Sequence, residues 1–178
     1  MASAAVKISV EEFLALPETE GLNRELVHGE VWEEPLGNAG ETHEIIKSNL
    51  AEALFVAAGR PRRFRVLCES AFRFGDAVLI PDISLLISSD PTRFGREDVL
   101  TCLPDIAVEI VSSDSASRLM QKIAVYREVG VSETWVLYPR LGTIAIYTKT
   151  AVRELRRADT LTSPLLRGFA FPLSELFS

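Results

Sequence analysis

The chain has 178 residues, of which 47% are hydrophobic and 25% are charged, and its formal net charge is −6. This length and composition predict one globular domain over residues 1–178, with a sizeable core. The acidic charge argues against a protein that coats nucleic acid non-specifically, because such binding depends on neutralising phosphates with lysine and arginine. A local basic surface remains compatible with it, and residues 60–65 contain four arginines.

The ends of the chain and its cysteines indicate the compartment. The first eight residues contain one lysine and no apolar stretch as long as a signal peptide, and no window approaches the length of a membrane-spanning helix. We therefore expect a cytoplasmic protein. Cys68 and Cys102 have no Cys-x-x-Cys spacing, which predicts buried free thiols rather than a disulfide or a zinc site.

The N-terminal quarter contains two local signals. Ser9 and Glu12 form a capping-box pattern that predicts a short helix over residues 9–14. Residues 24–32 predict a hairpin, because Gly29 readily adopts the positive φ that tight hairpin turns require.

The rest of the chain alternates between helical and strand periodicity. Breaks are expected near residues 69–70, at a turn over 75–76, and in a polar loop over 88–103. The expected elements are a helix over 42–58, strands over 64–74, 83–87 and 106–111, a helix over about 113–130 capped within 113–115, strands over 134–138 and 143–149, and shorter strands from 153 onward. This order predicts an α/β or α+β fold, with a mixed sheet and helices packed on its faces.

Two carboxylates interrupt apolar runs in this pattern. Asp82 lies within residues 78–87 and Glu109 within residues 106–111, and both runs are typical of strands covered on both faces. An ionised group there needs a partner, a proton or a metal. If the two strands are adjacent, the carboxylates repel each other unless a cation lies between them, and oxygen ligands favour Mg²⁺ or Mn²⁺.

Lys122 is the third candidate, because it shares a helix face with the apolar Leu119 and with Tyr126. Beside a metal-bound carboxylate pair, a lysine can orient an attacking water and stabilise charge on a phosphate. The structural alternatives are an amphipathic surface lysine, a Pro-Asp pair that merely opens a strand at Asp82, and a buried ion pair between Glu109 and an arginine.

The chain resembles the PD-(D/E)XK nuclease superfamily, and within it the Uma-two family of bacterial endonucleases. The resemblance spans nearly the whole sequence. It rests on the order and spacing of residues 24–31 (Arg-Glu-Leu-Val-His-Gly-Glu-Val), His43, Pro81-Asp82, residues 104–112, Lys122, Tyr126, Gly130-Val131 and Trp135. It implies a restriction-endonuclease-like fold: a mixed central β-sheet flanked by helices, with an N-terminal hairpin and additional C-terminal strands.

The resemblance also implies roles for individual residues. Asp82 and Glu109 would be the metal-binding acids, the carbonyl of Ile110 a further ligand, and Lys122 the catalytic lysine. The superfamily's usual lysine lies two residues after the glutamate, where this chain has Val111, and supply from the following helix is a known variation.

Two more residues match additional site positions of the family. Glu25 and His43 would contact a second metal or orient the water or phosphate, provided that both face the cleft of the two acids; a surface glutamate and a first-turn histidine are the alternatives. Many relatives carry an acid one turn before the lysine, where this chain has Arg118.

Together these features predict a Mg²⁺- or Mn²⁺-dependent endonuclease that hydrolyses phosphodiester bonds of nucleic acid, with DNA as the favoured substrate. The alternative is a catalytically inactive nuclease-fold module for binding or assembly. A Ser/His/Asp hydrolase is disfavoured, because the chain has two histidines and no Gly-x-Ser-x-Gly motif. Apolar edges at the Trp135 strand and the N-terminal hairpin suggest a homodimer.

Overall fold

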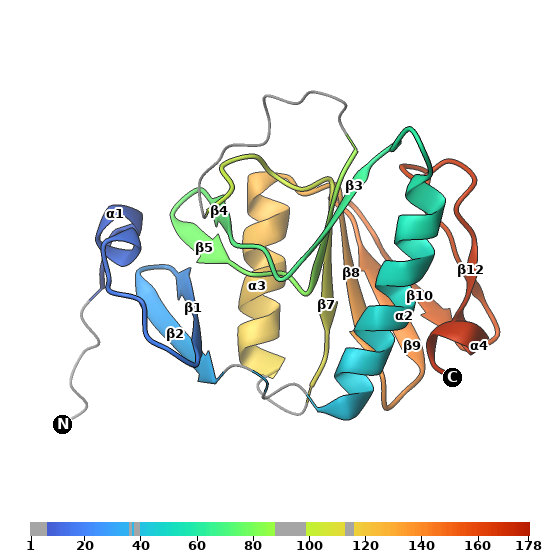
Figure 1. The fold of residues 1–178 in the computed structure, drawn as a ribbon, viewed down its shortest axis with the longest axis horizontal. Coiled ribbons are helices and arrows are strands. Elements are labelled where there is room, and N and C mark those ends of the chain that lie inside the picture. The colour runs from blue at the N-terminus through green and yellow to red at the C-terminus, as the bar shows by residue number, and fades with distance from the viewer. Residues whose placement is uncertain (1–6, 36, 38–39, 88–98, 113–115) are drawn as a thin grey trace.

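A mixed six-stranded sheet forms the centre of the molecule (Figure 1). The computed structural model describes residues 7–35, 37, 40–87, 99–112 and 116–178. The sheet order is β10-β9-β8-β7-β6-β3, with β7 and β8 parallel and the other neighbours antiparallel. Its strands are β3 (Arg65–Cys68), β6 (Ile83–Leu86), β7 (Ile106–Ile110), β8 (Glu133–Tyr138), β9 (Thr143–Tyr147) and β10 (Val152–Arg156).

Two smaller sheets and the helices surround this centre. A four-stranded sheet has the order β2-β1-β5-β4, and β11 pairs with β12. The strands are β1 (Leu22–Val27), β2 (Glu30–Pro35), β4 (Phe72–Phe74), β5 (Ala77–Leu79), β11 (Thr160–Leu161) and β12 (Phe171–Pro172). The helices are α1 (Val10–Leu14), α2 (Glu41–Ala58), α3 (Ala116–Val129) and α4 (Leu173–Leu176).

Alternate residues of β7 face two different hydrophobic clusters. Val108 packs in the cluster that contains Leu54 of α2, whereas Ala107 packs in the cluster that contains Tyr126 of α3 and Phe74 of β4. Helix α2 therefore covers one face of the central sheet, while α3 and the four-stranded sheet cover the other. Because the central strands are buried on both faces, their sequences are uninterrupted apolar runs. The expected mixed sheet with helices on its faces is confirmed.

The local signals near the N-terminus are confirmed. The Ser9 side chain accepts a hydrogen bond from the Glu12 amide at 3.1 Å, and the Glu12 carboxylate accepts one from the Ser9 amide at 2.7 Å. In the β1–β2 turn, His28 and Gly29 have φ values of 50° and 83°. Two successive positive φ angles are typical of the tight turn that suits the twist of a hairpin.

The apolar run over residues 78–87 is not one strand covered on both faces, which corrects that interpretation of the run, whereas the expected strand over residues 83–87 is present as β6. It contains β5 in the four-stranded sheet and β6 in the central sheet, and the chain passes from one sheet to the other at Ile80, Pro81 and Asp82. Proline has no amide hydrogen to donate to a ladder, so continuous pairing through Pro81 is disfavoured.

Other expectations differ in detail. Trp135 does not lie at an edge, because β8 pairs on both sides and the side chain is fully buried. Cys68 and Cys102 form no disulfide with each other, but neither is buried as expected: Cys68 is exposed and Cys102 is partly exposed. Helix α4 was not expected. The predicted caps at 113–115 and most of the polar loop, residues 88–98, lie outside the described residues.

Within the described part of the chain, no helix combines the length and the apolar character needed to cross a membrane.

Candidate active site

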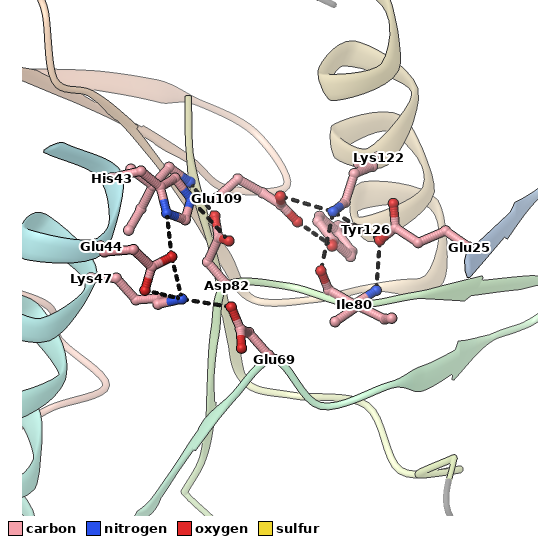
Figure 2. A network of polar contacts seen from close by, with 11 residues as sticks. Glu25, His43, Glu44, Lys47, Glu69, Ile80, Asp82, Glu109, Lys122 and Tyr126 are labelled. Carbon is pink, nitrogen blue, oxygen red and sulfur yellow. Dashed lines mark hydrogen bonds and ion pairs between the residues drawn. The ribbon is translucent and has the colours of Figure 1, made fainter. Parts of the chain in front are cut away.

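A cleft of about 570 Å³ opens where the central sheet meets α2, α3 and the N-terminal hairpin. Each of these elements contributes a polar side chain to it (Figure 2). The site residues expected from the sequence all line this cleft: Glu25 from β1, His43 from the first turn of α2, Asp82 just before β6, Glu109 and Ile110 from β7, and Lys122 from α3.

The two acids are neighbours because β6 and β7 pair antiparallel. Ile83 lies opposite Val108, so the same register continues to Asp82 opposite Glu109. Directly opposed residues of such a pair have Cβ atoms about 4.5–5.5 Å apart. Asp82 is anchored on the sheet, since its Oδ2 accepts a hydrogen bond from the Ile110 amide at 2.6 Å.

Lys122 points into the cleft rather than towards solvent. Its Nζ lies 2.9 Å from Glu109 Oε2 and 2.9 Å from Glu25 Oε1, and it donates a hydrogen bond to the Ile80 carbonyl at 3.3 Å. The side chains of Lys122 and Glu109 are only 11% and 9% exposed. The buried partner of Glu109 is therefore this lysine, and not the arginine considered as an alternative.

Glu25 and His43 each contact one of the central groups. Glu25 Oε1 accepts a hydrogen bond from the Ile80 amide at 2.7 Å, in addition to its ion pair with Lys122. His43 Nε2 lies 3.2 Å from Asp82 Oδ1. Both side chains face the cleft, as their proposed roles require.

Tyr126 belongs to the same network, although sequence reasoning assigned it no role. Its hydroxyl donates a hydrogen bond to Glu109 Oε1 at 2.5 Å, and its ring makes an edge contact with Phe74. The signal that could have identified it is its spacing, since it follows Lys122 by one helical turn and shares its face.

Lys47 is a second lysine of the cleft that the sequence did not single out. Its Nζ lies 2.8 Å from Glu44 Oε2 and 2.5 Å from Glu69 Oε1. It follows His43 by one turn of α2, so the same spacing rule could have found it.

Burial and charge shift the pKa values of the central groups. Burial raises the pKa of Glu109 to about 8; the charge of Lys122 opposes this shift, whereas the carboxylates of Asp82 and Glu25 reinforce it. Burial alone would lower the pKa of Lys122, but Glu109, Glu25 and Asp82 outweigh it and raise the pKa above its usual value. Two carboxylates therefore bind one ammonium, and a third, that of Asp82, acts on it electrostatically, so the cleft favours additional positive charge.

The chemistry of these groups fits a small divalent cation. Among the described residues, no three His, Cys, Asp or Glu side chains converge closely enough to hold a metal by themselves. Mg²⁺ does not need such a cage, because it usually keeps several waters and binds through one or two carboxylates. Asp82 and Glu109 supply two carboxylates beside the Ile110 backbone. Burial is the main cause of the raised pKa of Glu109, and the carboxylates of Asp82 and Glu25 add negative charge that a cation would neutralise.

Comparison with known proteins identifies the family. The model of the Uma2 family, described as "Putative restriction endonuclease", matches residues 10–174. The chain belongs to the Uma2 family. This membership supports a nuclease as the functional class. No curated protein matches the chain.

Among solved structures, the crystal structure of "a putative nuclease belonging to DUF820" from Anabaena variabilis ATCC 29413 is similar to this Uma2 chain. It has a TM-score of 0.83 and 24% sequence identity, over 96% of this chain and 97% of that chain. The likeness confirms the restriction-endonuclease-like fold.

Proposed function

We propose that this Uma2 protein is a Mg²⁺- or Mn²⁺-dependent endonuclease that hydrolyses phosphodiester bonds of nucleic acid, with DNA as the favoured substrate. The observation that carries the proposal is that Asp82 and Glu109 lie side by side in one cleft, where the Lys122 ammonium forms an ion pair with Glu109. Membership of a restriction-endonuclease family supports the same reaction class.

The carboxylates of Asp82 and Glu109, with the carbonyl of Ile110, would hold the metal ion. When bound, such an ion neutralises charge on the phosphate and lowers the pKa of a coordinated water. His43 is a positioning residue in this account, because its contact with Asp82 Oδ1 fixes the orientation of that carboxylate. Tyr126 holds Glu109 in the same way.

Lys122 is the proposed catalytic lysine. In the hydrolysis, a water oxygen forms a bond to phosphorus while the bond to the leaving oxygen breaks, and negative charge develops on the phosphoryl oxygens. An ammonium at this place can orient the water and stabilise that charge. Glu25 is a positioning residue, since it binds both the Lys122 ammonium and the Ile80 amide and so fixes the lysine against the β5–β6 connection.

Metal affinity tests the site. Titration calorimetry with Mn²⁺ should show binding to the wild-type protein and a large loss of affinity in Asp82→Asn and Glu109→Gln. Glu33→Gln is a matched control, because Glu33 lines the same cleft but pairs with Arg24 and not with Lys122. Unchanged affinity in both site variants would overturn the assignment. Metal binding without any turnover would instead favour the inactive binding or assembly module.

Three further predictions accompany the proposal: a single domain over residues 1–178, a cytoplasmic location and a homodimer. Because Trp135 is buried inside the central sheet, its strand does not offer the dimer surface that the sequence suggested. Light scattering coupled to size-exclusion chromatography measures the oligomeric state directly, and a monomer at all concentrations would contradict the homodimer.

A further inference from the structure

The cleft is acidic, which poses a problem for a polyanionic substrate. Of the described residues that line it, seven carry carboxylates and three carry permanent positive charges. Two of those cations are buried and engaged: Lys122 between Glu109 and Glu25, and Lys47 between Glu44 and Glu69. A phosphate that approaches the cleft therefore meets mostly negative charge.

Arg118 is the third cation, and its setting is different. Its side chain is 39% exposed, compared with 11% for Lys122 and 12% for Lys47. Its guanidinium carbon lies 5.2 Å from the centre of the Trp32 ring, and Nη1 donates a hydrogen bond to Glu34 Oε1 at 2.9 Å. A guanidinium has five N–H donors, so this single carboxylate oxygen leaves most of them able to bind another acceptor.

The cation–π contact with Trp32 restricts the position of the guanidinium. Trp32 is only 7% exposed, and its ring therefore forms a rigid platform on β2. A planar guanidinium held against an aromatic face is pre-organised for bidentate contact with phosphate, and less side-chain freedom is lost on binding.

We propose that Arg118, supported by Trp32, forms a phosphate subsite that binds a backbone phosphate of the nucleic acid next to the one being hydrolysed. This inference rests on the proposed function. Glu34 holds the guanidinium in place in the free protein. Its side chain is 59% exposed, and exposed ion pairs are weak, so an incoming phosphate can replace it.

The competing interpretation is purely structural. Arg118 lies on α3, while Trp32 and Glu34 lie on β2, so the contacts also connect the helix to the N-terminal hairpin. If that connection is their whole role, removal of Arg118 and removal of Glu34 should change the affinity for oligonucleotides in the same direction. The phosphate subsite predicts opposite directions, because Glu34 competes with the substrate for Arg118.

The experiment compares Arg118→Met with Glu34→Gln. Binding of fluorescent single-stranded and duplex DNA oligonucleotides is measured with Ca²⁺ in place of Mg²⁺ over a range of salt concentrations, and turnover is measured with Mg²⁺. Arg118→Met should weaken binding about ten- to a hundredfold, the range for charged hydrogen bonds. It should also reduce the slope of log affinity against log salt by about 0.7 to 0.9, as for one lost phosphate contact. Glu34→Gln should strengthen binding.

Kinetics and the related variants complete the test. Arg118→Met should raise KM and leave kcat nearly unchanged, since the contact is made in both the bound substrate and the transition state. Arg118→Lys should restore the salt slope, but only part of the affinity. Thermal melting of each variant shows whether it is folded.

The outcomes separate this subsite from the proposed function. Oligonucleotide binding and turnover that are unchanged in Arg118→Met, or weaker binding in Glu34→Gln, would overturn the subsite while leaving the nuclease in place. A wild-type protein that neither binds nor cleaves any oligonucleotide would overturn the proposed function, and the subsite with it.

Discussion

Replacement of Lys122 by methionine tests the central charge network of the cleft. Methionine keeps much of the side-chain volume but removes the ammonium that lies 2.9 Å from both Glu109 and Glu25. Loss of one partner from a buried ion pair costs about 3–5 kcal/mol of folding free energy. Because burial already raises the pKa of Glu109 to about 8, this carboxyl can take up a proton at neutral pH. We therefore expect the lower end of the range, about 3 kcal/mol.

For a chain of this length, that loss lowers the melting temperature by about 6–12 °C. The assay is thermal unfolding with a chelator and again with Mn²⁺. In Lys122→Met the carboxylates no longer bind an ammonium, so Mn²⁺ should stabilise the variant more than the wild-type protein. At a metal concentration a hundred times Kd, binding raises the free energy of unfolding by about 2.7 kcal/mol.

Lys47→Met is the matched control, because the same substitution there leaves two carboxylates that are half exposed. Glu44 and Glu69 are 50% and 55% exposed, and the expected loss is at most about 1 kcal/mol. Equal melting temperatures of Lys122→Met and the wild-type protein in chelator, or a variant that Mn²⁺ does not stabilise, would refute the reasoning.

Three other predictions follow from single features of the site and core. The folded pKa of Glu109, about 8, lies above its ordinary value of 4.5, so between these values the folded state binds an extra proton. The stability contributed by this group is therefore fully present at low pH and is lost as the pH rises through that window. The affinity for Mn²⁺ should rise over the same window. Denaturation measures the first trend and calorimetry the second at several pH values, and Glu109→Gln should remove both. Tyr126→Phe keeps the ring against Phe74 but removes the hydroxyl that donates a hydrogen bond to Glu109. Urea unfolding should show a free energy of unfolding lower by about 1.5–3 kcal/mol. An unchanged midpoint would contradict the role of the hydroxyl. Ser84 is fully buried and its hydroxyl has no hydrogen-bond partner among the described residues, so Ser84→Ala should unfold at equal or higher urea concentration; a clear loss of stability would show that the hydroxyl is bonded.

Local chemistry made part of the fold predictable. The capping box at Ser9 and the turn at Gly29 each depend on a few adjacent residues, and both are present as expected. The acids were recognisable because an ionisable group inside an apolar strand is costly, whichever strands lie beside it. Adjacency of β6 and β7 then followed from their order, since sequential strands are usually neighbours.

The remaining features depend on tertiary context. Hydrophobic periodicity does not reveal that residues 78–87 divide between two sheets, because β5 and β6 are both buried and read as one run. The interior place of Trp135 depends on β9 pairing with β8, and an isolated strand pattern does not indicate an edge. The contacts of Tyr126 and Lys47 needed the packing of helices on the sheet, although their spacing one turn after Lys122 and His43 was visible.

Cleavage of a substrate panel tests the central claim most directly. Supercoiled, linear, single-stranded and branched DNA, and RNA, would be incubated with the wild-type protein and Mg²⁺ or Mn²⁺, beside Asp82→Asn, Glu109→Gln and Lys122→Met proteins shown to be folded. We expect metal-dependent cleavage that is lost in all three variants. Cleavage that survives these substitutions, or no cleavage of any substrate by the wild-type protein, would contradict it.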